Sequence, residues 1–299
     1  QPPDQKVWEA RQRLVRELCP RSLFRDRLVL EAQLTDEQEI NGRRLAAVLE
    51  HPVGFPGLNR ILVIQTLLAL GTISLGIGAL LNWLPGYWMF TFGAYALIYL
   101  MTDQGEELLE HAIGLHHEME RLSKVLRFLE RHATREGSTL TQTCKPLMEP
   151  GRSPSSFTRH VARIFHGISV KAHPLAHLVF NAICPWALFF AFRLRQFQER
   201  VRDRLPIWLD RLAEVEAASA LATFAYLHPM YAWPTLSSSV GLHSDRLGHP
   251  LIPDSVRVTN DIRLSGLGTI HLITGSNMSG KSTFLRTIGI NLCLAQAGA

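Results

Sequence analysis

The sequence predicts a mostly α-helical chain that contains an uncharged helical hairpin and leads into the beginning of an α/β domain. Three observations predict this fold class. No charged residue or histidine occurs between Ile61 and Thr102. Apolar residues recur mostly every three or four positions between Glu106 and His132, as on one face of a helix. Finally, a β-branched run, a glycine-rich loop and a second helical pattern follow one another from Thr269 to Ala297.

The glycine-rich loop is the most specific pattern in the chain. Residues 275–283 read Gly-Ser-Asn-Met-Ser-Gly-Lys-Ser-Thr and fit the phosphate-binding pattern G-x-x-x-x-G-K-[ST] at every defined position. Before the loop, Thr269–Thr274 suits a buried parallel strand, and after it Ser282–Ala297 suits a helix. This order of strand, loop and helix predicts the start of an α/β P-loop NTPase, with ATP as the expected nucleotide.

Each part of the loop has an expected contact with the nucleotide. Gly275 and Gly280 permit the backbone angles of the loop. Lys281 is expected to reach the β and γ phosphates and is the candidate catalytic residue, while the Ser282 hydroxyl is expected to ligate Mg²⁺. The residues expected to surround the phosphates are Gly275, Ser276, Asn277, Met278, Ser279, Gly280, Lys281, Ser282 and Thr283.

The loop resembles that of the MutS mismatch-repair ATPases, which reads G-P-N-M-G-G-K-S-T-x-[LM]-R. Asn277–Met278 carries the likeness, because an ABC transporter loop usually has Gly at the first of these positions. Upstream, Gly248–Leu251 resembles the family's R-H-P-[LV] segment, and Val258–Asp261 resembles its [IV]-x-N-[DP] strand end. Leu209–Ala222 resembles the long helix that returns from the MutS lever into the ATPase domain, so the likeness covers about residues 205–299.

Three features depart from the MutS pattern. Ser276 and Ser279 stand where the family has Pro and Gly, which removes no phosphate contact. Arg257 stands where MutS proteins often carry an aromatic residue that stacks on adenine. Since a guanidinium also stacks on rings, Arg257 is either an adenine contact or a surface strand residue. The mismatch-reading domain of MutS, with its Phe-x-Glu wedge, has no visible counterpart, since the letters at Phe128–Glu130 and Phe197–Glu199 lie in charged helical patterns.

The resemblance implies a MutS-type ATPase that uses Mg²⁺, converts ATP and water to ADP and phosphate, and forms a homodimer through its ATPase domains, with DNA as a possible partner. The chain stops just after the phosphate-loop helix, so we expect a truncated piece without the Walker B and signature motifs that lie further on in the family. The alternative function is a membrane-anchored nucleotide switch that acts on a protein or lipid partner without mismatch recognition. Asn277–Met278 disfavours a transporter ATPase.

The uncharged run is expected to anchor the protein in a bilayer, as in a membrane-associated branch of the family. Ile61–Thr102 comprises 42 residues, enough for two crossings of about 20 apolar residues each, and Asn82–Gly86 supplies a turn. Ser74 and Gly78 form a small-xxx-small pair that suits close approach of two helices. The alternative is two buried helices of a soluble domain. Aromatic residues near the turn suit a membrane interface: Trp83, Tyr87 and Trp88.

A hairpin returns the chain to the side on which it started, so residues 1–60 and 103–299 are expected to share one compartment. ATP use and the excess of Arg and Lys before the hairpin indicate the cytoplasm. We therefore expect a multi-pass protein of the plasma membrane with its ATPase on the cytoplasmic side. A second apolar run, Ala172–Phe192, is interpreted as a buried helix, with a third crossing as its alternative.

These observations divide the chain into four parts. They are an N-terminal cytosolic helical segment (1–57), the transmembrane hairpin (58–102), a helical core or lever region (103–240) and the N-terminal part of the MutS-type ATPase domain (241–299). A connector with a domain seam is expected at Arg135–Pro154, and another seam is expected near Pro234–Asp254, between helix and ATPase strands.

Composition adds few constraints on function. A net charge of +5 with 19% charged residues is modest for a nucleic-acid binder. The densest basic group, between Arg193 and Arg204, is either a solvated helix face or a contact for DNA or lipid phosphate. The four cysteines are scattered and are read as reduced thiols. Five histidines lack the partners of a metal site: His111, His116, His117, His173 and His177.

Overall fold

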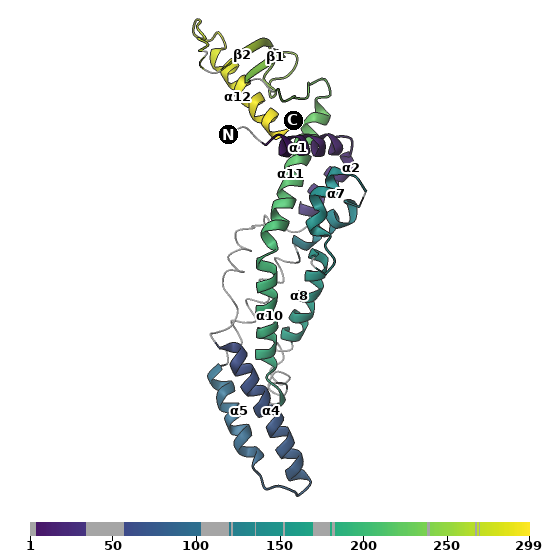
Figure 1. Ribbon diagram of the computed structural model, residues 1–299, viewed down its shortest axis with the longest axis vertical. Helices are drawn as coiled ribbons and strands as arrows, with labels where there is room; N and C mark the ends of the chain where they lie inside the picture. The colour runs from purple at the N-terminus through teal and green to yellow at the C-terminus, as the bar shows by residue number, and fades with distance from the viewer. Residues whose placement is uncertain are drawn as a thin grey trace. The chain divides into compact units, whose positions relative to one another are not determined.

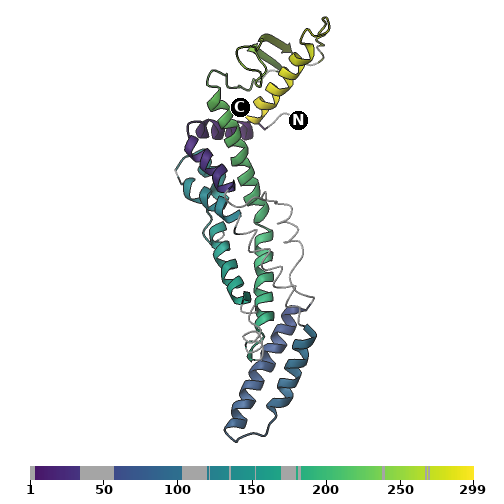
Figure 2. The ribbon, with the colours of Figure 1, turned by 180° about the vertical axis from the view of Figure 1, so that it is seen from behind.

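The computed structural model describes residues 4–33, 57–102, 120, 122–134, 136–151, 153–169, 180, 183–237, 240–266, 268 and 270–299. The chain separates into two compact units, each assembled from segments that are distant in sequence. The hairpin unit comprises Leu28–Glu136 and Thr143–Ala213. The C-terminal unit comprises Gln1–Arg27, Gly137–Gln142 and Glu214–Ala299. Figures 1 and 2 show their helices and strands from opposite sides.

The predicted helical hairpin is present in the hairpin unit. Helices α4 (Leu58–Leu80) and α5 (Trp88–Thr102) lie side by side and are joined at the far end by a short turn (Figure 1). Asn82 adopts the left-handed conformation at φ 54°, which Asn tolerates better than most residues. The backbone N–H groups of Trp83 and Leu84 donate to the carbonyl of Gly78, at 2.9 and 3.3 Å, and close the end of α4.

The prediction that Ser74 and Gly78 allow close approach of the opposite helix is wrong. Ser74 is exposed, and the neighbour of Gly78 is the side chain of Leu84 in the turn. A Cβ atom on Gly78 would lie 2.9 Å from Leu84 Cδ1, so the small residue accommodates the turn. The two helices are linked instead by a hydrogen bond of 2.9 Å between the hydroxyls of Thr72 and Thr91.

The outer surface of the hairpin is apolar and largely exposed. In the described residues, α4 is the one helix long and apolar enough to cross a bilayer. Its 23 residues correspond to about 35 Å at 1.5 Å per residue. The 15 residues of α5 correspond to about 22 Å, less than the ~30 Å of a hydrocarbon core. The sequence predicted two full crossings, whereas α4 alone has the required length among the described residues, which stop at Thr102 in this segment.

The rest of the hairpin unit is a helical core. Helices α8 (Pro154–Ser169) and α10 (Trp186–Arg202) pack on each other, and α10 also packs on α4 (Figure 1). The Phe157 ring lies 5.8 Å from that of Phe197 and meets the ring of Trp208 edge-on at 5.1 Å. Trp208 is fully buried at the start of α11 (Leu205–Leu227), the long helix that the sequence predicted.

The connector predicted at Arg135–Pro154 is wrong, although a boundary between the two units falls within it, and the seam predicted near Pro234–Asp254 lies inside one unit. Arg135–Pro154 contains α7 (Thr139–Cys144) and a 3₁₀ turn, η1 (Lys145–Leu147). Leu140, Cys144 and Leu147 are fully buried there, because these apolar positions share one helical face among Ser and Thr residues. Pro234–Asp254 contains strand β1 (Gly241–Leu247), which pairs antiparallel with β2 (Asn260–Ser265).

Other predictions lie partly or wholly outside the described residues. Residues 122–132 are helical as predicted, but the first part of that pattern is not described, nor are His111, His116, His117, His173 and His177. In the second apolar run, α10 begins after Pro185, and Phe180, Ile183 and Phe189 are 40–55% exposed. The predicted buried helix is confirmed only in part, because Leu188 and Ala191 are buried while these three side chains are exposed.

Helix α1 (Gln5–Leu18) organises the C-terminal unit. It buries one face, formed by Trp8, Leu14, Val15 and Leu18. The Trp8 indole donates to the carbonyl of Ala295 at 2.6 Å, and the Gln12 amide donates to that of Pro234 at 2.8 Å. The next helix, α2 (Ser22–Gln33), contributes the buried Arg25, whose guanidinium donates to the Thr223 hydroxyl at 3.0 Å. The beginning of the chain therefore contacts both α11 and the last helix, α12 (Lys281–Ala297).

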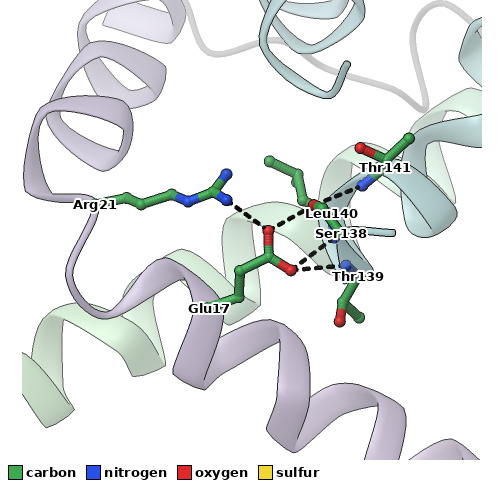
Figure 3. A network of polar contacts seen from close by, with 6 residues as sticks. All are labelled: Glu17, Arg21, Ser138, Thr139, Leu140 and Thr141. Carbon is green, nitrogen blue, oxygen red and sulfur yellow. Dashed lines mark hydrogen bonds and ion pairs between the residues drawn. The ribbon is translucent and has the colours of Figure 1, made fainter. Parts of the chain in front are cut away.

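The Glu17 carboxylate caps the N-terminus of α7 (Figure 3). It accepts hydrogen bonds from the Ser138 hydroxyl at 2.6 Å and from the N–H groups of Thr139 and Leu140 at 2.7 and 3.3 Å. Arg21 forms an ion pair with it at 2.9 Å. Burial opposes ionisation of Glu17, but these hydrogen bonds and the charge of Arg21 outweigh it and hold its pKa below the usual value.

We expect Glu17→Gln to destabilise the C-terminal unit by about 1–2 kcal/mol, as the loss of a helix cap does. Because the pKa of Glu17 is lowered in the folded state, its contribution is present above pH 4.5, the usual value, and disappears as the pH falls through the folded-state pKa. Denaturant unfolding at pH 7 and at pH 3 measures both effects. The control is Glu9→Gln on the same helix; an equal loss in the two variants would contradict a capping role.

Candidate phosphate-binding site

The glycine loop lies in the C-terminal unit and ends directly in α12, as predicted. Gly275 and Gly280 have positive φ angles of 158° and 85°, and Met278, fully exposed, has φ 65°. A Cβ atom on Gly275 would lie 2.8 Å from the Ser279 hydroxyl, so a larger residue would displace the Ser279 side chain. Gly280 is the N-cap of α12 and offers no side-chain hydrogen bond to the helix. The first N–H groups of α12 therefore lack an intrahelical partner.

The Lys281 side chain folds back over the loop. Its ammonium group donates to the carbonyl oxygens of Gly275 at 2.7 Å and Ser276 at 2.5 Å, and to the Ser279 hydroxyl at 3.4 Å. A positive charge and unpaired helix N–H groups thus meet in one loop. Ser282 and Thr283 lie beside them in the first turn of the helix with exposed side chains. This arrangement suits an anion, because the helix dipole and the ammonium charge act in the same direction.

The strand expected before the loop does not form in the described residues. Residues 270–276 carry no strand pairing, and Ile270 and Leu272 are 92% and 86% exposed. A strand requires a partner for its backbone groups, and the described sheet consists of β1 and β2 alone, paired with each other. The expected end of a strand at Val258–Asp261 is also wrong, because β2 begins at Asn260.

Arg257 does not lie on the surface of a strand, and its side chain contacts other residues of the chain. Its guanidinium lies over the Tyr231 ring at 4.9 Å, donates to the Tyr231 hydroxyl and pairs with Asp254 at 2.6 Å. Its side chain is only 14% exposed, so the interpretation as a surface strand residue is wrong. The adenine contact of Arg257 stays a prediction.

Sequence reasoning missed the contacts that hold the loop's helix in place. The Asn291 amide on α12 donates to the carbonyl of Gly248 at 3.0 Å. A Cβ atom on Gly248 would lie 2.7 Å from the Arg257 side chain, so Gly248 is closely covered. The segment with the R-H-P-like letters is therefore held between α12 and Arg257. The pattern of the sequence carried no signal for Asn291, because its partner is 43 residues away.

The glycines, Lys281 and the start of α12 together have the chemistry of a cradle for an anion. Binding of a nucleotide there stays a prediction. The nine loop residues named from the sequence lie together in it, and Arg257 is bound to Tyr231 and Asp254.

Over about a third of its length, the chain is similar to curated MutS proteins. It is 36% identical over 116 residues to "DNA mismatch repair protein MutS 1" of Halobacterium salinarum, which covers 38% of this chain and 13% of the relative. It is 35% identical over 98 residues to the MutS of Ehrlichia ruminantium, covering 32% of this chain and 12% of the relative. For the MutS of Staphylococcus epidermidis the identity is 33% over 111 residues, covering 36% and 13%.

No family model matches the chain, and no solved structure matches it. The similarity to MutS proteins supports a relationship with that family, and the chain spans only about an eighth of the length of these curated relatives.

Proposed function

We propose that this chain is part of a membrane-anchored, MutS-related ATPase that couples ATP binding and hydrolysis to conformational change and binds DNA. The observation that carries the proposal is the geometry of the loop, in which Lys281 and the start of α12 converge. The partial similarity to proteins named for DNA mismatch repair supports it. The complete protein is proposed to act as a homodimer through its ATPase domains.

The residues of the loop suit a nucleoside triphosphate. Backbone N–H groups of residues 276–283 hold the phosphate oxygens, and Gly275 and Gly280 allow the backbone to curve around them. The Lys281 ammonium exchanges its carbonyl partners for phosphate oxygens, which requires only side-chain rotation at the end of a flexible stem. The Ser282 hydroxyl is the proposed protein ligand of Mg²⁺, which neutralises charge on the phosphates.

We expect Lys281→Ala in the complete protein to reduce the affinity for a non-hydrolysable ATP analogue by at least about tenfold, because a hydrogen bond to a charged group is worth about 1.5–3 kcal/mol. Isothermal titration calorimetry with Mg²⁺ measures the affinity. Arg263→Ala, which removes an exposed positive charge from β2, is the matched control. Unchanged binding by Lys281→Ala would contradict the assignment of the phosphate loop.

The hairpin is the proposed anchor. Helix α4 has the length and composition of a membrane-crossing helix, and its outer side chains Val63, Leu67 and Leu70 are 57–64% exposed. Because α5 is shorter, its crossing depends on local thinning of the bilayer or on residues beyond Thr102. The plasma membrane, with the phosphate loop on the cytoplasmic side, is the proposed location.

Deleting residues 58–102 is expected to move the complete protein from the membrane pellet to the supernatant after alkaline carbonate extraction, because the uncharged surface is removed. Immunoblotting of the two fractions gives the result. A deletion variant that stays in the pellet while remaining monodisperse in detergent would place the anchor elsewhere.

A second function is favoured by the hairpin: a nucleotide switch at the membrane that acts on a protein or lipid partner without mismatch recognition. The two functions differ in their response to DNA. For a repair ATPase we expect mismatched DNA to raise the ATPase rate of the complete protein in detergent above the rate with homoduplex DNA. A rate indifferent to both DNAs, with Lys281→Ala as the blank, would favour the switch.

A further inference from the structure

A hollow lies in the hairpin unit where the start of α4 meets the middle of α10. Its volume is about 520 Å³, and it is lined by Gly57, Leu58, Asn59, Arg60 and Arg195. The lining comes from two segments that are far apart in sequence, so the hollow exists only because α10 packs on α4. This volume is within the range of small-molecule sites.

The hollow is positively charged. Arg60 is exposed, and within the described residues no acidic side chain pairs with it. Arg195 pairs only weakly, at 3.3 Å, with Glu199, whose side chain is 65% exposed and therefore accessible to water. The two guanidinium groups are thus available to an anion.

Further arginines strengthen the positive field along α10. Burial lowers the pKa of His160 on α8, and Arg193, Arg163 and Arg200 lower it further. Two of these arginines are on α10 together with Arg195, and Arg163 belongs to α8. Because these three side chains have no pairing acid in the described residues, the face between α8 and α10 attracts negative charge.

The hollow also lies at the edge of the apolar surface. Arg60 is the last charged residue before the uncharged run, which starts at Ile61. Within the next turn, Val63 and Ile64 are 58% and 48% exposed. If α4 is inserted in a bilayer, Arg60 is at the depth where lipid phosphates lie, and arginine stems extend toward that depth.

We propose that this hollow binds the phosphate of an anionic phospholipid headgroup, held by Arg60 and Arg195, while the acyl chains lie along the exposed apolar side of α4. A guanidinium binds phosphate oxygens through two parallel N–H donors, so two arginines give a strong and directional contact. The proposal rests on the proposed membrane anchoring and adds a lipid preference to it. The site is separate from the phosphate loop, which belongs to the C-terminal unit.

The test uses the complete protein in nanodiscs of phosphatidylcholine that contain a spin-labelled lipid, either phosphatidylglycerol or phosphatidylcholine. Electron paramagnetic resonance gives the fraction of labelled lipid immobilised by the protein, and hence the preference for the anionic lipid. We expect the double variant Arg60→Gln/Arg195→Gln to lower this preference by about tenfold, the order expected for two arginines near a membrane surface. The control is Arg159→Gln/Arg202→Gln, which removes two exposed arginines of α8 and α10 that do not line the hollow.

The outcomes separate this proposal from the anchor itself. A wild-type protein that immobilises both lipids equally overturns the headgroup site but leaves the anchor intact. A protein that does not enter nanodiscs at all overturns the anchor, and the headgroup site with it. Equal loss in both double variants, or loss of DNA binding in Arg60→Gln/Arg195→Gln with an unchanged lipid preference, overturns the assignment of the hollow to lipid. Circular dichroism of both variants establishes that they are folded.

Discussion

Burial of one face of α1 is the constraint on which the C-terminal unit depends. Trp8, Leu14, Val15 and Leu18 are removed from water at the junction of segments from the two ends of the sequence. Each such side chain contributes about 1.5–3 kcal/mol when fully buried. The indole N–H of Trp8 also donates a hydrogen bond to the carbonyl of Ala295 at the end of α12. The first helix therefore supports the helix that begins at the phosphate loop. Helix α12 begins at the glycines of the loop, and its last turn is held by a residue 287 positions away in sequence.

The helical hairpin follows a different constraint, the absence of charge from Ile61 to Thr102. Within α4 and α5 the backbone groups are paired along each helix, and most of the side chains that face outward are apolar. A long helix of this kind is stable in hydrocarbon because it leaves no backbone polar group unpaired. The charged residue that borders the uncharged run is Arg60, which lines a hollow together with Arg195 of α10. An apolar rod that meets a basic hollow is physically consistent with a protein that interacts with both the interior and the surface of a membrane.

The two proposed binding sites recognise the same chemistry by different means. The phosphate loop uses backbone N–H groups and one lysine, whose positions follow from backbone angles at Gly275 and Gly280. The hollow uses two arginine side chains brought together by helix packing. The residues of the phosphate loop are consecutive in sequence, whereas the two arginines of the hollow are far apart. This difference explains why the loop was found from the sequence and the hollow was not.

The sequence by itself determined the features that depend on neighbouring residues. These are the loop with its glycines and Lys281, the helix that follows it, the long helix α11, and the hairpin with its turn near Asn82. Each follows from backbone preference, helical periodicity or a run without charge. The strand predicted at Thr269–Thr274 is wrong, because a strand also needs a partner strand. Helix α7 was not predicted, because it has few apolar positions.

Only the tertiary structure decided which distant groups meet. Ser138 donates to Glu17 across 121 positions, and Arg195 lines a hollow with Arg60. Arg257, which the motif alone left undecided, packs on Tyr231. Such pairs have no signature in the neighbouring residues, because an arginine or glutamate fits the helical pattern equally well whether or not it has a distant partner. Their partners are selected when apolar faces pack, and packing depends on the whole chain at once.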